Sequence, residues 1–316
     1  MSDEIVKKSQ GSSLWKDAWH RLSGNKPALV SLGVLSVIVV ACFVGPFLPF
    51  VKAPSTINLQ NIVAAPSAEH WFGTDQLGRD VFSRVLYGGQ VSLLVGFVAT
   101  GVAVMIGVIY GSVSGYVGGI ADSVMMRFVD IMFALPFLVL VILFALVVDK
   151  PSSDFTTWVI ETTGWERDRV APITTLIPLF IAIGAIGWLT IARIVRAQVM
   201  NVKNLEFVEA AISLGLSRKR ILFRHILPNV IGPIIIYTTL AVPGVMLMES
   251  VLSFLGLGVK PPNSSWGILI KEGADRMEVT PYLLLFPSLF FATTLFALNF
   301  LGDGLRDALD PKSSKD

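Results

Sequence analysis

The feature that constrains this chain most is a series of apolar segments that contain no basic residue. Each is about 20 residues long, the length that a helix needs to cross the ~30 Å hydrocarbon core of a bilayer. The composition agrees, because 53% of the 316 residues are hydrophobic and only 15% are charged, against roughly 25% in a soluble domain. We therefore predict an all-α membrane protein with six transmembrane helices, at residues 28–50, 91–114, 128–148, 171–192, 231–248 and 281–301.

The distribution of lysine and arginine gives these spans an orientation. With the N-terminus in the cytoplasm, 16 of the 25 Lys and Arg residues fall on the cytoplasmic side and 9 on the outer side. Loops on the cytoplasmic side of membrane proteins carry the excess of basic residues. We therefore expect both termini, and the loop before the fifth span, to face the cytoplasm. Residues 13–20 of the N-terminal tail form either a short amphipathic helix on the membrane surface or an unstructured basic segment.

The longest polar interruption in the second half of the chain lies between the fourth and fifth spans. Residues 209–228 read EAAISLGLSRKRILFRHILP. Gly215 stands where a helix would end in a left-handed residue, and Ser217 stands where a second helix would be N-capped. We predict a helix, a tight turn and a second helix, which Pro228 stops or kinks.

The first of these two helices has two faces when residues 203–214 are placed on an ideal helix. The polar arc holds Lys203, Glu206, Glu209, Ala210 and Ser213. The apolar side holds Leu205, Phe207, Val208, Ala211, Ile212 and Leu214. Such a helix suits the membrane surface, where one side meets apolar groups and the other meets water.

This stretch resembles the EAA loop of ABC importer permeases, through Glu209-Ala210-Ala211, Gly215 and Leu227-Pro228. In that family the loop forms a coupling helix that docks on a cytoplasmic ATPase subunit. The resemblance implies an ATPase-coupling site made of Leu205, Phe207, Glu209, Ala210, Ala211, Leu214, Gly215, Leu216 and Pro228. Glu209 would meet either an arginine of the ATPase or the basic residues of its own loop. The alternative for the whole stretch is an ordinary surface amphipathic helix.

Three further segments narrow the resemblance to the C-type permease subunit of oligopeptide or dipeptide ABC importers. They are GTDQLGRD at 73–80, ESVLSFLGLG at 249–258, and GDGLRDALDPK from Gly302. The resemblance implies the permease fold of type I ABC importers. It divides the chain into a cytoplasmic tail (1–27), a first transmembrane helix with a periplasmic loop (28–90), a five-helix core (91–304) containing the coupling loop (about 193–230), and a cytoplasmic C-terminal tail (305–316).

The family also implies partners and a location. These are a second, homologous permease, two ATP-binding cassette ATPases and an extracytoplasmic substrate-binding protein, assembled in the cytoplasmic (inner) membrane of a bacterium. The expected substrate is an oligopeptide, with dipeptides, nickel, glutathione or antimicrobial peptides as alternatives. A secondary transporter or channel that works without ATP is the alternative from another class. We expect no nucleic-acid partner.

Motifs for chemistry are absent from the sequence. There is no G-x-x-x-x-G-K-[ST] phosphate-binding loop, so we expect ATP to be hydrolysed by a partner. No G-x-S-x-G or H-E-x-x-H motif offers an intramembrane hydrolase. The single cysteine, Cys42, and three dispersed histidines offer no metal site. We therefore expect a non-catalytic subunit without a cofactor.

Small residues recur every four positions in the second span, at Ala99, Ala103, Gly107, Gly111, Gly115 and Gly119. Such a stripe lets a neighbouring helix backbone approach closely. We predict that Gly107, Gly111 and Gly115 are helix-packing positions, within this subunit or across a subunit interface.

Charged residues near the span ends give three local predictions, and a proline inside the third span gives a fourth. Asp80 and Arg84, spaced i,i+4, and Arg127 and Asp130, spaced i,i+3, are candidate helical ion pairs. Glu249 is expected near the outer surface, at the start of a separate re-entrant or interfacial helix over 249–258. Pro136 is expected to kink the third span.

Overall fold

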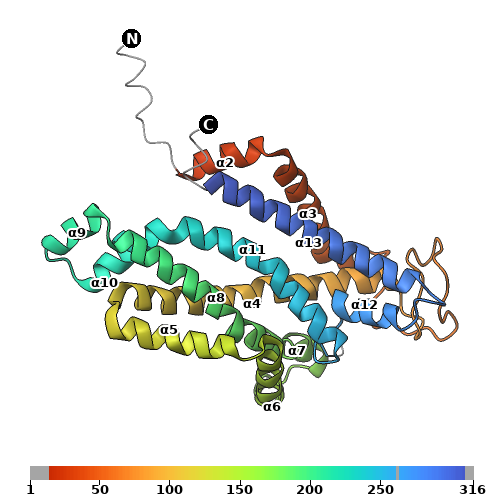
Figure 1. Cartoon of the computed structure of the whole chain (residues 1–316). Coiled ribbons are helices and arrows are strands. Elements are labelled where there is room, and N and C mark those ends of the chain that lie inside the picture. The colour runs from red at the N-terminus through yellow and green to blue at the C-terminus, as the bar shows by residue number, and fades with distance from the viewer. Residues whose placement is uncertain (1–13, 261–262, 310–316) are drawn as a thin grey trace, which may run out of the picture.

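The structure, a computed structural model, describes residues 14–260 and 263–309 (Figure 1). The predicted terminal tails therefore lie largely outside the described residues, which leave out 1–13 and 310–316. Within the described part the chain is helical, with one isolated β-bridge, between Thr74 and Asp80. The first half contains α2 (Leu14–Gly24), α3 (Lys26–Val44), η2 (Gly45–Phe47), α4 (Val81–Val117), α5 (Gly119–Ala134) and α6 (Phe137–Thr163). The second half contains α7 (Arg167–Thr174), α8 (Ile177–Lys203), α9 (Glu206–Ser213), α10 (Arg218–Ile221), η3 (Leu222–Ile226), α11 (Leu227–Phe254), α12 (Trp266–Ala274) and α13 (Tyr282–Leu309).

The predicted all-α membrane architecture is confirmed. Five helical segments of the described chain are long and apolar enough to span a membrane: Lys26–Phe47, Val81–Val117, Val170–Lys203, Arg218–Phe254 and Tyr282–Leu309. The number rises to six when the bent pair of α5 and α6 counts as one span. Of the two descriptions left open for the N-terminal segment, the helix is present as α2, which packs through Ala18 and Leu22 against Ala308.

The predicted third span, 128–148, is wrong as a single kinked helix. It is divided between α5 and α6, which meet at an angle of 95°. The residue before a proline is pushed out of the helical region, and Leu135, before Pro136, is extended with φ −83° and ψ 143°. The predicted outer loop at 149–170 is also mostly helical, because α6 continues to Thr163 and α7 begins at Arg167.

Several other helices are longer than the charge pattern predicts. α4 begins at Val81, ten residues before the predicted start, because Asp80 caps it by accepting a hydrogen bond from the Ser83 amide at 2.8 Å. α8 continues to Lys203 and α13 to Leu309, so residues 302–309 are helical and do not form a tail.

The predicted effects of Pro228 and of residues 249–258 also differ from the structure. The chain stays helical through Pro228, which lies in the first turn of α11, where a missing amide hydrogen costs no bond. The preceding residues Leu222–Ile226 form a wide π turn. α11 then continues to Phe254, so Glu249 belongs to this helix and not to a separate re-entrant one.

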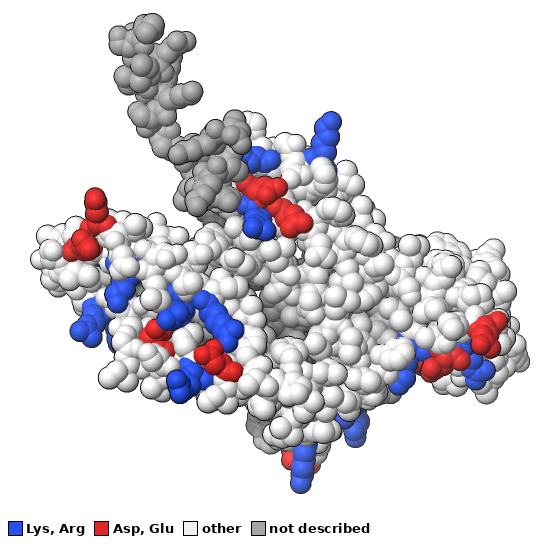
Figure 2. Space-filling view, in the orientation of Figure 1, with Lys and Arg blue, Asp and Glu red and all other residues white. Residues whose placement is uncertain are grey.

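The helices are arranged so that the predicted coupling segment and the first long loop lie at opposite ends of the molecule (Figure 1). In Figure 1, α4, α8 and α11 run along the long dimension of the molecule. α9 and α10 lie at one end, and α12 with the loop between η2 and α4 lies at the other. On the face shown in Figure 2, Lys, Arg, Asp and Glu gather in clusters with a broad uncharged surface between them. This pattern is what a helical bundle needs to sit in a bilayer with polar ends.

Candidate functional site

The stretch between α8 and α11 forms the predicted helix, turn and helix. The Gly215 amide donates to the Ile212 carbonyl at 2.9 Å, and the Leu216 amide donates to the Ala211 carbonyl at 3.2 Å. Together these bonds form a Schellman motif, which closes a helix through a left-handed residue. Gly215 is that residue, with φ +73°. Ser217 then caps α10, because its hydroxyl accepts from the Arg220 amide.

The apolar residues in and next to α9 divide into a buried set and an exposed set. The ideal-helix projection of the sequence placed both sets on the same side. Val208 and Ala211 are buried, and they pack with Ile221 and Ile226 in a cluster that also holds Val195 of α8. The remaining apolar residues are exposed: Leu205, Phe207, Ile212 and Leu214, the last with 79% of its surface accessible. The buried set fixes α9 on α8, and the exposed set leaves an apolar surface.

The other predicted coupling residues lie as follows. Glu209, Ala210, Gly215 and Pro228 are exposed, while Leu216 is half-buried against the cluster beneath α9. Ala211 faces inward and is not accessible to a partner. No ion pair joins Glu209 to another residue in the described part of the chain. Eight of the nine predicted residues are therefore exposed or half-buried, and Ala211 is buried.

The glycines of α4 lie against α8, the helix that leads into α9. A side-chain carbon added to Gly107 would lie 2.7 Å from Cβ of Ile191, and one added to Gly115 would lie 2.8 Å from the Arg196 carbonyl oxygen. One added to Gly111 would collide with the Ala192 carbonyl oxygen. The close approach is within this chain. The stripe ends there, because Gly119 has no neighbour of this kind within 4 Å.

Two ion pairs connect α5 to α8 beside this contact. Arg196 donates to both carboxylate oxygens of Asp122 at 2.5 Å, and Arg193 donates to Asp130 at 2.6 Å. The predicted Arg127–Asp130 pair is therefore wrong, because Asp130 pairs across the helices. A sequence reading limited to i,i+3 and i,i+4 spacing cannot find partners that lie 63 and 74 residues away.

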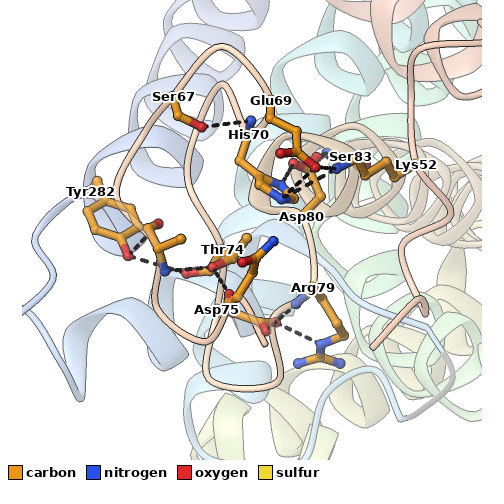
Figure 3. A network of polar contacts seen from close by, with 12 residues as sticks. Lys52, Ser67, Glu69, His70, Thr74, Asp75, Arg79, Asp80, Ser83 and Tyr282 are labelled. Carbon is orange, nitrogen blue, oxygen red and sulfur yellow. Dashed lines mark hydrogen bonds and ion pairs between the residues drawn. The ribbon is translucent and has the colours of Figure 1, made fainter. Parts of the chain in front are cut away.

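A second polar network organises the opposite end (Figure 3). Asp75 accepts from the side chains of Arg79 and Arg84, each at 2.7 Å. Arg84 also pairs with Glu272 of α12 at 2.5 Å. The predicted Asp80–Arg84 pair is therefore wrong. Tyr282 at the start of α13 donates to the carbonyl of Ala64, which joins the loop to a third helix.

Asp80 binds His70 and Ser83 in an arrangement that is not catalytic. His70 Nδ1 lies 2.8 Å from the Asp80 carboxylate, and the Ser83 hydroxyl donates to the same carboxylate at 2.8 Å. A nucleophilic serine needs a hydrogen bond to the histidine base, and here it binds the acid instead. All three side chains are buried. The group fastens the loop to the start of α4.

The sequence reading missed a buried junction around Glu249. This carboxylate is fully buried in α11, where it accepts from Ser253 at 2.6 Å and contacts Ser92 of α4 at 3.3 Å. Ser92 also accepts from the amide of Trp266, whose indole donates to the Val85 carbonyl at 2.9 Å. Trp266 is fully buried at the start of α12. The only sign of this junction is that Ser92, Ser253 and Ser265 lie near Glu249. Those residues are brought together by the tertiary structure, so the sequence alone does not reveal the junction.

Comparison with known proteins shows the class to which this fold and these sites belong. Residues 103–315 match the family described as binding-protein-dependent transport system inner membrane component, and the chain belongs to that family. Residues 13–66 match the N-terminal TM domain of oligopeptide transport permease C. The protein is a multi-pass protein of the bacterial inner membrane and a permease subunit of the C type.

Individual relatives cover nearly the whole chain. It is 47% identical over 306 residues to the oligopeptide transport system permease protein OppC of Haemophilus influenzae, which covers 96% of this chain and 90% of that protein. It is 41% identical to OppC of Bacillus subtilis, covering 99% of this chain and 94% of that protein. It is 42% identical to the dipeptide transport system permease protein DppC of Bacillus subtilis, covering 95% and 86%.

Proposed function

We propose that this chain is the membrane-spanning permease of an ATP-driven oligopeptide importer, and that the α9–α10 turn couples it to a separate ATPase. The two OppC relatives support the substrate class. The identity to DppC keeps dipeptides as a second candidate. Membership of a binding-protein-dependent family favours ATP-driven import over the alternative of a channel or secondary transporter.

The remaining partners follow from this proposal. A second permease completes the translocation pathway, two ATPase subunits supply the energy, and an extracytoplasmic binding protein delivers the peptide. α9 and α10 lie on the cytoplasmic side together with both termini, as the excess of basic residues on that side favours. In that orientation, α12 faces outward, and so does the loop between η2 and α4.

One observation carries the coupling assignment. The exposed apolar residues of α9 stand on a helix whose inner face is packed on α8 and whose end is fixed by the Gly215 turn. An apolar surface held rigidly at a polar end of a membrane protein is typical of a docking site. Leu214 and Phe207 fill the groove of the ATPase in this proposal, and Glu209, which has no partner in the described chain, sets the register.

The test uses the left-handed conformation of Gly215. Gly215→Val should abolish coupling, because a β-branched residue resists positive φ, although no atom blocks its side chain. Gly215→Asn is the matched control, since asparagine adopts the left-handed conformation more readily. The measurement is ATPase pull-down together with hydrolysis stimulated by the peptide-loaded binding protein in reconstituted vesicles. We expect Gly215→Asn to keep most of both activities and Gly215→Val to lose them.

Glu209→Ala should weaken coupling less, because one charged contact at a partly wet interface contributes about 1–3 kcal/mol. Both Gly215→Val and Glu209→Ala should still insert in the membrane, since neither changes a span. Full stimulation and full transport by Gly215→Val would remove the basis for placing the coupling site at this turn.

A further inference from the structure

A cavity of about 960 Å³ opens at the end of the molecule opposite α9 and α10. Its walls come from residues 53–57 of the first loop, the start of α4, the connection between α11 and α12, and α12 itself. This volume is at the upper end of the range for sites that bind small organic ligands. The charged residues of its wall are Arg79, Arg84, Lys271, Glu272 and Asp275. The cavity is therefore polar and carries both signs of charge.

Most of these charges are already satisfied. Arg79 pairs with Asp75, and Arg84 lies between Asp75 and Glu272. The second carboxylate oxygen of Glu272 accepts from Arg84 at 3.2 Å, so this pair uses both oxygens. Paired groups of this kind hold α12 against α4 and have little capacity left for a ligand.

Lys271 is the exception among the cations. It lines the cavity, it is partly buried, and its ammonium group makes no hydrogen bond or ion pair with another described residue. Its ammonium group points toward the end of α11, where a side-chain carbon on Gly256 would lie 3.7 Å from Nζ. The C-terminus of a helix attracts a cation only weakly, and it leaves the three N–H donors of the lysine free.

The anions near Lys271 restrict the ligand. Asp275 lies one turn along α12, lines the same cavity, and has no ion-pair partner among the described residues. A multiply charged anion such as phosphate would be repelled by Asp275 and Glu272. A ligand that carries one carboxylate and also N–H donors suits this wall, because the carboxylate can bind the ammonium group of Lys271 and the N–H donors can bind the carboxylate of Asp275.

We infer that this cavity is a transit site for the C-terminal end of a peptide, with Lys271 as the cation that receives its carboxylate. The inference rests on the proposed function, which supplies the peptide and places this end of the molecule outside. Since an extended peptide advances about 3.3–3.6 Å per residue, only its last few residues occupy the cavity. Lys271 is thus a residue that selects peptides with a free carboxyl end.

The test compares one fluorescent peptide in two forms, with a free C-terminus and with an amidated one. Equilibrium binding is measured on the permease–ATPase complex in lipid nanodiscs, without the binding protein, whose own selectivity would obscure the result. The wild-type complex should bind the free form about tenfold more tightly, which corresponds to about 1.4 kcal/mol. Lys271→Gln should remove this preference. Lys260→Gln is the matched control, because Lys260 lies at the same end but pairs with Asp149 outside the cavity.

Each other outcome overturns the inference. These outcomes are a wild type that binds both forms equally or neither, a Lys271→Gln variant that keeps the preference, and a Lys260→Gln variant that loses it. Transport of the free peptide by the wild-type complex with its binding protein is measured separately in vesicles. If that transport fails, the proposed function is wrong. If transport succeeds but binding shows no preference for the free C-terminus that depends on Lys271, only the transit site is wrong.

Discussion

At the scale of single residues, the packing of α4 against α8 depends on glycines, which have no side chain to hold the two helices apart. Gly107, Gly111 and Gly115 bring the backbone of α4 against that of α8, and their neighbours are carbonyl oxygens and β-carbons, which do not rotate away. In a bilayer, helices gain little from burying apolar surface against each other, so packing of this kind carries much of their association.

Gly111→Leu should lower the stability of the purified protein by about 1–3 kcal/mol, because an overpacked contact forces the two backbones apart. Gly101→Leu is the matched control, since Gly101 lies on the same helix with nothing within 4 Å of an added side chain. It should change stability by less than about 0.5 kcal/mol. Thermal unfolding in detergent compares the two, and equal melting temperatures would show that the glycine contact is dispensable.

At the scale of elements, the 95° bend between α5 and α6 is the feature that departs most from a simple bundle. α5 turns back beside α4 and α8 and is held there by two ion pairs of different exposure. The side chains of Arg196 and Asp122 are 30% and 11% accessible, whereas those of Arg193 and Asp130 are 45% and 64% accessible. The Asp122 pair should therefore contribute more to the position of α5.

Asp122→Asn should destabilise the protein by on the order of 3 kcal/mol, because it leaves Arg196 without its partner in a partly buried place. Asp130→Asn removes a more exposed pair and should cost less than about 1 kcal/mol. Hydrogen exchange of the α5 amides measures both effects. Faster exchange in Asp130→Asn than in Asp122→Asn would contradict this ranking.

At the scale of the whole molecule, the two polar ends differ in construction. The end with α9 and α10 presents exposed apolar residues on a short helix. The other end is a loop fastened by buried charges and by Tyr282. An apolar surface suits docking of a soluble subunit, and a braced polar vestibule suits the entry of a solute.

The orientation proposed for these ends has a direct test. A cysteine at Ser67, in the outer loop, should react with a membrane-impermeant thiol reagent added from outside intact cells. A cysteine at Ser217, which caps α10, should react only after the membrane is permeabilised. The background is low, because Cys42 is the chain's sole cysteine and is buried. Labelling of position 217 from outside would reverse the orientation and remove the coupling proposal.

Signals that act within a few residues were readable from the sequence, and those that depend on distant partners were not. Gly215 and Ser217 predicted the turn correctly, because a left-handed residue and an N-cap are local requirements. The beginning of α4 was misplaced, since the charge of Arg84 suggested a loop and is neutralised by Glu272, 188 residues away. Pro136 marked a bend, but a proline in the sequence does not give the angle of 95° between α5 and α6. Ala211 was assigned to the coupling surface through its place in the EAA motif, but a motif cannot tell which side of the helix meets its own protein, and Ala211 is buried.

The close contact between α4 and α8 has a mechanical consequence. Two backbones in contact through glycines have no intervening side chains that change rotamer, so the pair transmits force with little compliance. α4 has 37 residues, which is a rod of roughly 55 Å. One end of this rod carries Arg84 and the brace to α12, and the partner helix α8 continues into α9. A displacement of α9 would therefore be transmitted through α8 and α4, and the loop before α4 would move together with α9.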